Sequence, residues 1–215
     1  QLKSFCMVFT PNSANDFLGD LENSYQRRNI VHFIAGSSIP LLPDHVWIVV
    51  RGMIKLSCLN EQGEDTLLGI LGPNHCFGEP FTDLELCESK TLSDCDLLCI
   101  SMDEITSTPH LSVNLMHCLI NRHRQSEAFI SLLGLRGVQN RVCGLLELLV
   151  QDYGQPCEQG LLLTLRLTHQ EIANALSTTR VTVTRVMGIL KDQGWLLHDK
   201  DQRIIVKHLP KRQFK

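Results

Sequence analysis

Two arginines stand out in the stretch STTRVTVTRVMGIL, residues 177–190, because no acidic residue accompanies them. Arg180 and Arg185 each carry a planar guanidinium, which can donate paired hydrogen bonds to guanine O6 and N7 or to a phosphate. Val181, between them, offers methyl groups that suit a thymine methyl. A carboxylate here would repel phosphate, so its absence predicts a polyanionic partner, and the spacing of the arginines suits the DNA major groove.

The elements around these arginines fit a winged helix-turn-helix. Thr168 and Glu171 form a T-x-x-E capping box, which predicts a first helix with Ile172 and Leu176 on its buried side. A second helix is expected to begin after Thr178 or Thr179 and to end at Gly194. Its apolar face is Val183, Val186, Met187 and Leu190. WLLH and RIIV flank the turn DKDQ and predict a two-stranded wing.

In such a unit the second helix enters the major groove with its N-terminal side chains at base edges. We expect Thr182 and Thr184 to donate to phosphate, as backbone N–H groups at a helix start can. The residues predicted to contact double-stranded DNA are Thr168, His169, Gln170, Thr178, Thr179, Arg180, Val181, Thr182, Thr184 and Arg185.

Short strands separated by turns dominate residues 21–102. The strand-like stretches are HVWIVVRGMIKLSCL (45–59), DTLLGILG (65–72) and KTLSDCDLLCISM (90–102). The turns between them are NEQG (60–63) and GPNHCFGEP (72–80). This pattern predicts an antiparallel β-roll or barrel.

A long helix is expected to follow, over residues 111–136. Its apolar residues form two stripes, Leu115, Leu119, Phe129 and Leu133 on one side and Met116, Ile120 and Ile130 on the other. Two stripes predict packing on two sides, one against the chain's own domain and one against a second copy in a homodimer. A helix over 138–153, ended by Gly154 and Pro156, and a strand over 161–167 complete the pattern.

Charge separates the chain of 215 residues into two parts. Residues 1–136 hold 9 basic and 16 acidic residues, a net charge of −7, whereas residues 137–215 hold 11 and 7, a net charge of +4. We therefore expect an α+β protein with a β-roll at 1–108, a dimerisation helix at 109–136 and a DNA-binding domain at 137–215.

No apolar run is long enough for a membrane span. The chain begins at Gln1, so we expect residues to precede it in the native protein.

Nine cysteines have no C-x-x-C or other metal-ligand spacing. Their odd number favours reduced thiols in a cytoplasm, most of them in the core, with a redox role for one or two as an alternative. Cys95 and Cys99, four apart in a strand, are expected on one face.

No Ser/His/Asp constellation or Walker loop is present, so we do not expect an enzyme.

The order of roll, long helix and winged helix-turn-helix resembles the cyclic AMP receptor protein/fumarate–nitrate regulator family of bacterial transcription factors, over residues 21–210. (That receptor protein is one of the standard examples of helix-turn-helix docking.) The stretch LTHQEIANALSTTRVTVTRVMGIL is most similar to the cyanobacterial global nitrogen regulators. The resemblance implies a palindromic GTA…TAC site read by Arg180, Val181 and Arg185.

For an effector, the resemblance points to the turn FGEP, Phe77, Gly78, Glu79 and Pro80, and to Arg122, Ser126 and Glu127 on the long helix. Cyclic-nucleotide-binding members follow FGE with an Arg-Ser/Thr pair, but FTDLELCESKTLSDC contains no arginine, so we do not expect cyclic AMP. The nitrogen regulators bind 2-oxoglutarate, which makes it a candidate here, although their roll arginine is also missing. The polar stretch around Arg122 could equally be solvated or form an interhelix salt bridge.

Two more modes of control stay open. The roll could be a protein-interaction platform without any effector, or a thiol redox switch could control the protein. Iron–sulfur members carry an N-terminal cysteine cluster, where this chain has Cys6 alone, and the HC pair at 75–76 does not match a haem register. The exposed turns 152–160 and 60–65 lie where family activators contact RNA polymerase, which makes it an expected partner.

Overall fold

The computed structural model describes residues 30–59, 65–85 and 87–207. Its N-terminal half is built from seven short strands, a 3-10 turn η1 and a short helix α2. The strands are β1 (Ile30–Phe33), β2 (His45–Arg51), β3 (Ile54–Leu59), β4 (Asp65–Leu71), β5 (Cys76–Gly78), β6 (Cys87–Thr91) and β7 (Cys95–Ser101). The 3-10 turn is Glu79–Phe81 and α2 is Met102–Ser107. Residues 21–29, the turn at 60–63 and Cys6 lie outside the described residues.

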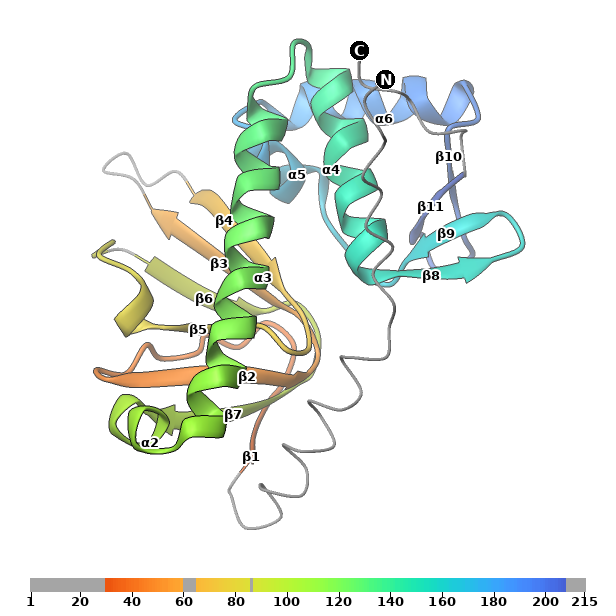
Figure 1. The fold of residues 1–215 in the computed structure, drawn as a ribbon. Helices are drawn as coiled ribbons and strands as arrows, with labels where there is room; N and C mark the ends of the chain where they lie inside the picture. Colours follow the sequence, from red (N-terminus) through yellow and green to blue (C-terminus); the bar gives the residue numbers. More distant parts are fainter. Residues whose placement is uncertain (1–29, 60–64, 86, 208–215) are drawn as a thin grey trace, which may run out of the picture.

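These strands form the expected antiparallel β-roll. One sheet has the order β1-β7-β2-β5 and the other the order β4-β3-β6 (Figure 1). Alternate residues of the strands point inward, so Trp47, Ile54, Phe77 and Leu97 pack together in the core. Cys95 is buried and Cys99 packs against the same cluster, which confirms that they share a face. The turn-rich stretch 72–80 contains a strand, β5, because its backbone pairs with β2.

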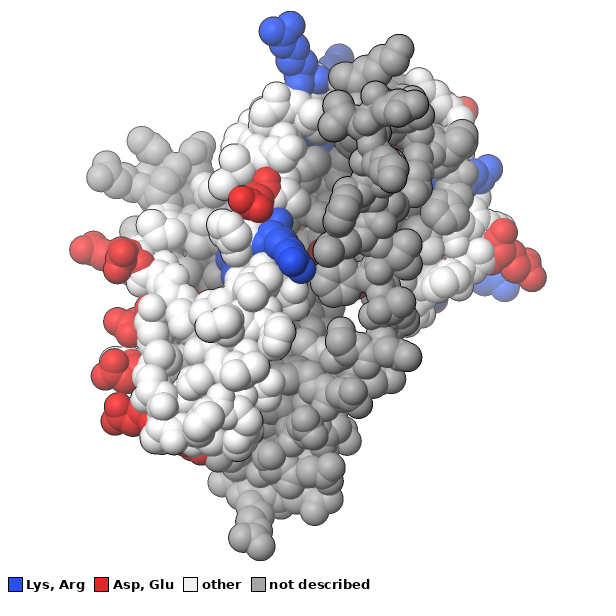
Figure 2. Space-filling model, viewed as in Figure 1, with Lys and Arg blue, Asp and Glu red and all other residues white. Residues whose placement is uncertain are grey.

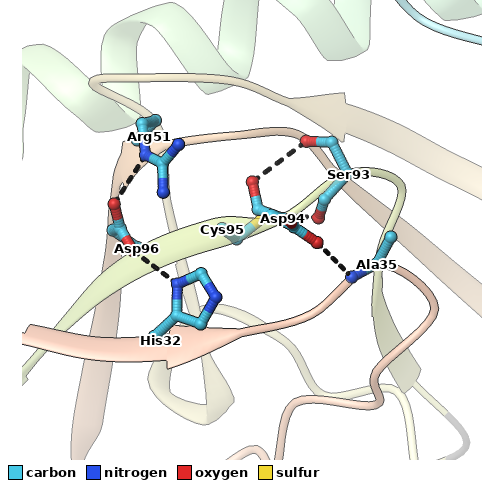
Figure 3. Close-up of polar contacts among 7 residues, drawn as sticks. All are labelled: His32, Ala35, Arg51, Ser93, Asp94, Cys95 and Asp96. Carbon is cyan, nitrogen blue, oxygen red and sulfur yellow. Dashed lines mark hydrogen bonds and ion pairs between the residues drawn. The ribbon is translucent and has the colours of Figure 1, made fainter.

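Polar side chains fix the neighbouring strands β1, β7 and β2 at their shared end (Figure 3). Asp96 accepts from Arg51 Nε at 2.6 Å, and its other oxygen lies 2.8 Å from His32 Nδ1. The hydrogen bonds from Arg51 and then His32 lower the pKa of Asp96. Asp94 accepts from the backbone N–H of Ala35 at 2.9 Å. The pairings Arg51↔Asp96 and His32↔Asp96 thus join three strands at one residue.

Helix α3 (Pro109–Leu133) runs along the roll and on to the C-terminal half (Figure 1). It begins two residues before the expected start, because proline is tolerated in a first helical turn, and it ends three residues before Arg136, with Gly134 as its cap. Its inner face, including Leu111, Leu115 and Cys118, packs on the roll. Its outer face is exposed and apolar: Val113 (56%), Met116 (62%), Ile120 (41%) and Ile130 (70%).

The C-terminal half begins with α4 (Val138–Tyr153), at the predicted bounds. It continues with β8 (Gly154–Cys157), β9 (Gly160–Leu163), α5 (His169–Ala175), α6 (Arg180–Asp192), β10 (Leu196–His198) and β11 (Ile204–Val206). Its sheet has the order β10-β11-β9-β8, so the wing is part of four strands instead of two.

Two expectations for this half were wrong. The strand predicted over 161–167 covers only Gly160–Leu163, because its partners end there. The segment 152–160 is not simply an exposed turn, since Gly154–Cys157 pairs with β9. Pro156 is tolerated because β8 is an edge strand, where one backbone N–H has no sheet partner.

One core joins this half to the roll. Leu145, Ile172, Val183 and Leu196 are fully buried in it, and Ile70 of β4 packs into the same cluster. The architecture is therefore α+β, with a roll, a long helix and a winged helix-turn-helix, as the sequence predicts. No helix in the described part of the chain combines the length and apolar character that a bilayer crossing requires.

Candidate nucleic-acid interface

Side-chain caps define both helices of the helix-turn-helix. The Thr168 hydroxyl accepts from the backbone N–H of Glu171, and the Glu171 carboxylate accepts from the backbone N–H of Thr168 at 2.6 Å, which confirms the capping box. Thr179, and not Thr178, caps α6 by accepting from the backbone N–H of Thr182 at 3.2 Å. Such caps stabilise a helix by about 1 kcal/mol each, so the helix starts are fixed by local sequence.

Helix α6 has one buried and one exposed face. Its buried residues are Val183, Val186, Met187 and Leu190, the predicted set. Arg180, Thr184 and Arg185 are exposed, and Val181 is 79% exposed. Val181 is therefore available to contact a partner together with the arginines that flank it. The recognition face predicted from the sequence is therefore presented to solvent.

The end of α6 is a Schellman motif. Gly194 has a φ of +68°, the left-handed conformation that glycine adopts without a side-chain clash. Its N–H donates to Lys191 O at 2.9 Å, and the N–H of Trp195 donates to Leu190 O at 2.9 Å. The turn directs Trp195 into the core, where it is 7% exposed, and leads into the wing.

The exposed face of α6 is positively charged. Among the described residues, neither Arg180 nor Arg185 has a side-chain hydrogen bond or ion pair, and the first acid of the helix is Asp192, its last residue. The positive end of the helix dipole adds to this charge. The outer edge of the roll, in contrast, carries a row of acidic side chains (Figure 2). Both guanidinium groups can therefore bind an external anion or base edge.

The smaller polar residues of the site hold one another in place. His169 Nδ1 lies 2.8 Å from Thr184 Oγ1, and Thr184 donates to the carbonyl of Arg180 at 2.9 Å. Thr182 Oγ1 lies 2.9 Å from Thr179 Oγ1. The bond between His169 and Thr184 ties α5 to α6, and the phosphate contacts expected of Thr182 and Thr184 would have to compete with these bonds.

Two further predicted contact residues, Gln170 and Thr178, lie beside the start of α6. Gln170 donates to the side chain of Asn174 at 2.7 Å, and Thr178 is half-buried. Both border a cleft of about 730 Å³ between the helix-turn-helix and β4, together with Asp65. The cleft lies next to Arg180, so the roll and the recognition helix are neighbours.

A second hollow, of about 560 Å³, lies between the roll and α3. We call it the roll cavity. Its lining includes Phe77, Gly78, Phe81, Phe129 and Leu133, so most of its wall is apolar. Arg122 is the one arginine among the described lining residues, and no lysine accompanies it. A ligand of this cavity would find apolar walls and a single guanidinium.

Arg122 is already bound to the roll. Both of its terminal nitrogens donate to Leu68 O at 3.1 Å, and Nη1 also donates to Gln125 Oε1 at 3.2 Å. Burial lowers the pKa of Arg122, although its guanidinium remains the cation of this site. Gly69 of β4 permits this approach, because a Cβ there would overlap Arg122 Nη1 and Gln125 Oε1.

Gln125 connects this contact to α4. It is 5% exposed, and its amide nitrogen donates to Ile70 O at 2.9 Å and lies 3.2 Å from the Tyr153 hydroxyl. Tyr153 also donates to Ile70 O, at 2.7 Å. One strand, β4, is thus bonded to both α3 and α4. Gln125 was not predicted from the sequence, since nothing in the polar stretch NRHRQSE distinguishes its one buried amide.

The expected effector residues are only partly brought together. Phe77, Gly78, Arg122 and Ser126 line the roll cavity, whereas Glu79 and Pro80 are exposed in η1 and lie outside its lining. Glu127 also lies outside the lining, on the outer face of α3, with its carboxylate 3.4 Å from His123 Nε2. An (i, i+4) pair of this kind follows from helical spacing.

Within the described ranges, no cluster of three or more His, Cys, Asp or Glu side chains could hold a metal ion, and the eight described cysteines are free thiols.

Comparisons with known proteins agree with this arrangement. The Crp-like helix-turn-helix domain matches residues 140–211, and the cyclic nucleotide-binding domain matches residues 42–108. A global nitrogen regulator of Nostoc sp. is 30% identical over 100% of this chain and 98% of its own length. The cyclic AMP receptor protein of Thermus thermophilus is 29% identical over 69% of each chain.

Solved structures show the same fold. A CRP/FNR family transcriptional regulator from Thermus thermophilus superposes with a TM-score of 0.69 at 25% identity, over 84% of this chain and 94% of its own. The c-di-GMP-responsive regulator CLP of Xanthomonas campestris gives a TM-score of 0.71 at 19% identity, over 89% and 99%. The relatives are regulators of transcription and not enzymes. With both halves matched and a relative aligned from end to end, the chain belongs to the CRP/FNR family of DNA-binding transcriptional regulators.

Proposed function

We propose that two copies of the chain bind a palindromic DNA site of the GTA…TAC type through Arg180, Val181 and Arg185. The observation that carries this proposal is the exposed face of α6, where these three side chains stand opposite the buried Val183 and Leu190. Arginine suits guanine, and the valine methyls suit thymine. Because its partner is DNA, the protein would act in the cytoplasm.

The outer face of α3 supports the dimer. Met116, Ile120 and Ile130 are exposed at helical spacings that form one stripe, and isolated chains rarely leave such a stripe in water. A second α3 would cover it. The resulting two-fold axis would place two recognition helices about 34 Å apart, one helical turn of DNA.

An effector would bind in the roll cavity, with Arg122 as its anion-binding group. The lining favours a small carboxylate over cyclic AMP, because no arginine of the roll lines the cavity and Arg122 alone is available for the cyclic phosphate. We propose 2-oxoglutarate as the first compound to test. The mostly apolar wall also suits a second candidate function, in which the roll binds a protein and no small molecule.

RNA polymerase would be the protein partner on promoter DNA. The candidate contact is the β8–β9 hairpin, in which Gln155, Pro156 and Cys157 are exposed. The other predicted contact, 60–65, lies outside the described residues except for Asp65, which faces the helix-turn-helix.

Fluorescence anisotropy tests the proposal. The GTA…TAC palindrome and a scrambled duplex would be compared at one salt concentration, because phosphate contacts make affinity depend steeply on salt. We expect preferential binding of the palindrome, and stronger binding with millimolar 2-oxoglutarate. Equal affinity for the two duplexes would refute the assignment of Arg180, Val181 and Arg185. An unchanged affinity with 2-oxoglutarate would refute that effector while leaving the DNA site intact.

A further inference from the structure

Two cysteines face each other across the wall of the roll cavity. Cys58 of β3 and Cys87 of β6 are directly opposite in the antiparallel pairing. Both are half-buried, and Cys87 lines the roll cavity. They are 29 positions apart in the sequence, so only the fold brings them together.

The hydrogen-bond pattern shows which kind of pair they form. On the far side of β6, Ser89 O accepts from Ile39 N and Thr91 N donates to Ser37 O, both at 2.9 Å. Backbone groups alternate sides along a strand, so those of Cys87 also point away from β3. Cys58 and Cys87 are therefore a non-hydrogen-bonded pair, whose Cα atoms lie about 4.5 Å apart. That separation is within the range that a disulfide spans, about 4.4–6.8 Å.

Cys87 is the member of the pair that a small oxidant can reach, because it lines the roll cavity. Burial raises its pKa, and the adjacent Cys58 raises it further, whereas a hydrogen bond with Thr82 and the charge of Arg122 lower it. Arg122 offsets only part of this rise, so the role of Cys87 as the attacking thiol rests on its position in the cavity wall, where a small molecule can reach it. Cys58 is positioned as the resolving thiol.

A second pair provides a contrast within the same molecule. Cys76 of β5 and Cys118 of α3 are hydrogen-bonded to each other. Cys76 also borders the cavity, but Cys118 does not, and the two residues are 1% and 2% exposed. Because both side chains are almost fully buried and only one of them borders the cavity, we expect this pair to stay reduced.

We propose that Cys58 and Cys87 form a reversible disulfide when a hydroperoxide enters the roll cavity. The Cys87 thiolate attacks one peroxide oxygen, the O–O bond breaks, and a sulfenic acid and a hydroxide form. The Cys58 sulfur then attacks the sulfenic sulfur; the S–S bond forms, the S–O bond breaks and water leaves. Overall, two thiols and one hydrogen peroxide give one disulfide and two waters, so the sulfurs are oxidised and the peroxide is reduced.

The disulfide would join β3 to β6 at the wall that faces Arg122, and so make the cavity an oxidant sensor. This sensor role rests on the proposed DNA-binding function, whereas the disulfide itself does not. The two parts are therefore measured separately.

The test uses the full chain with Cys157→Ser, which removes an exposed thiol that could link two molecules. Reduced protein is treated with hydrogen peroxide, remaining thiols are alkylated, and peptides are mapped by mass spectrometry without reductant. We expect a Cys58–Cys87 cross-link that dithiothreitol reverses, and alkylated Cys76 and Cys118. Cys76→Ser should retain the cross-link, and Cys58→Ser should leave Cys87 as a sulfenic acid that dimedone traps.

Linkage of Cys76 to Cys118 instead, or no intramolecular cross-link before irreversible oxidation begins, would overturn the proposal. Anisotropy then measures DNA affinity before and after oxidation. We expect a change of about fivefold or more, the lower end of typical allosteric coupling. A complete cross-link with unchanged affinity overturns the sensor role. If the reduced protein does not prefer the palindrome, the proposed function fails, and the peptide map still decides whether the disulfide forms.

Discussion

Arg185 on α6 and Arg122 on α3 place the same side chain in opposite surroundings. Arg185 is exposed and has no side-chain partner among the described residues, whereas Arg122 is half-buried and bonded to Leu68 O and Gln125. On α6 the Thr179 cap and the buried Val183 and Leu190 hold the backbone, so the arginines are left for an external partner. On α3 the carbonyl of Leu68 in the roll already accepts hydrogen bonds from the guanidinium of Arg122.

This difference indicates which of the two arginines must break internal hydrogen bonds before it can bind a partner. DNA can meet Arg185 without breaking an internal hydrogen bond. A ligand in the roll cavity must share or replace the bond between Arg122 and Leu68, which holds α3 to β4. Its binding energy is therefore coupled to the position of α3, as regulation through this helix requires.

The largest expected effect comes from the outer face of α3. Ile130→Asp would place two like charges in the proposed dimer contact, so we expect a monomer by light scattering. Loss of the second DNA-binding domain should weaken palindrome binding on the order of 100-fold or more, since the two half-sites then no longer act together. Ile34→Asp is the matched control, because Ile34 is 67% exposed on the roll and Ile130 is 70% exposed. A dimeric Ile130→Asp variant would contradict the assignment of this face.

Removing a DNA-reading arginine should have the next largest effect. Arg185→Ala is expected to cost about 1–3 kcal/mol per half-site, chiefly for the palindrome and less for a scrambled duplex. Lys191→Ala removes the same charge from the last turn of α6 and serves as the control. Anisotropy at one salt concentration measures both. If the two variants lose affinity equally for both duplexes, Arg185 contributes charge and does not read sequence.

The buried side of α3 should affect stability more than recognition. Gln125→Leu removes the donor to Ile70 O and the acceptor for Arg122, which should cost about 1–3 kcal/mol of unfolding free energy. In a domain of this size, each kcal/mol lowers Tm by about 2–4 °C. Gln155→Leu, at an exposed position of β8, should change Tm little. An unchanged Tm for Gln125→Leu would show that this buried network contributes nothing to stability.

The smallest effect is expected at Asp65, between β4 and the helix-turn-helix. Burial opposes its ionisation, but the ion pair with Lys55, together with the nearby polar groups of Ser57 and Asn174, outweighs burial and lowers its pKa. A lowered pKa means that the ionised form stabilises the fold above the ordinary pKa, and that this contribution is lost as pH falls through the lower value. Asp65→Asn should therefore cost about 1 kcal/mol or less at pH 7. Urea unfolding at several pH values should show the difference shrinking below about pH 4, and a difference that grows with acidity would contradict this sign.

The sequence was informative where structure is locally determined. The bounds of α4 and the cap of α5 were predicted, and the cap of α6 was narrowed to Thr178 or Thr179, because helical periodicity and capping residues lie within a few positions of one another. The buried face of α6 followed from the same periodicity. The exposed arginines of the candidate site were identified together with it.

Features that depend on distant segments were not predicted. The strand β8 forms because β9 is available as its partner. This pairing outweighs the low strand propensity of Gly154 and Pro156. Gln125 is buried because the carbonyl of Ile70 lies opposite it, 55 positions away in the chain. The opposition of Cys58 and Cys87 depends on strand register, which composition and spacing do not specify.

The missing side chain at Gly69 has a mechanical consequence. No side chain separates the β4 backbone from Arg122 and Gln125. The strand and α3 are therefore in direct contact, and the hydrogen bonds between them leave little room for one to move without the other. Ile70, on the same strand, packs among Leu145 of α4 and Ile172 of α5, so β4 has helices of the DNA-binding half on it as well. A small rotation of α3 would then move β4, and through β4 the helices α4 and α5, which pack against the helix α6 that carries Arg180 and Arg185.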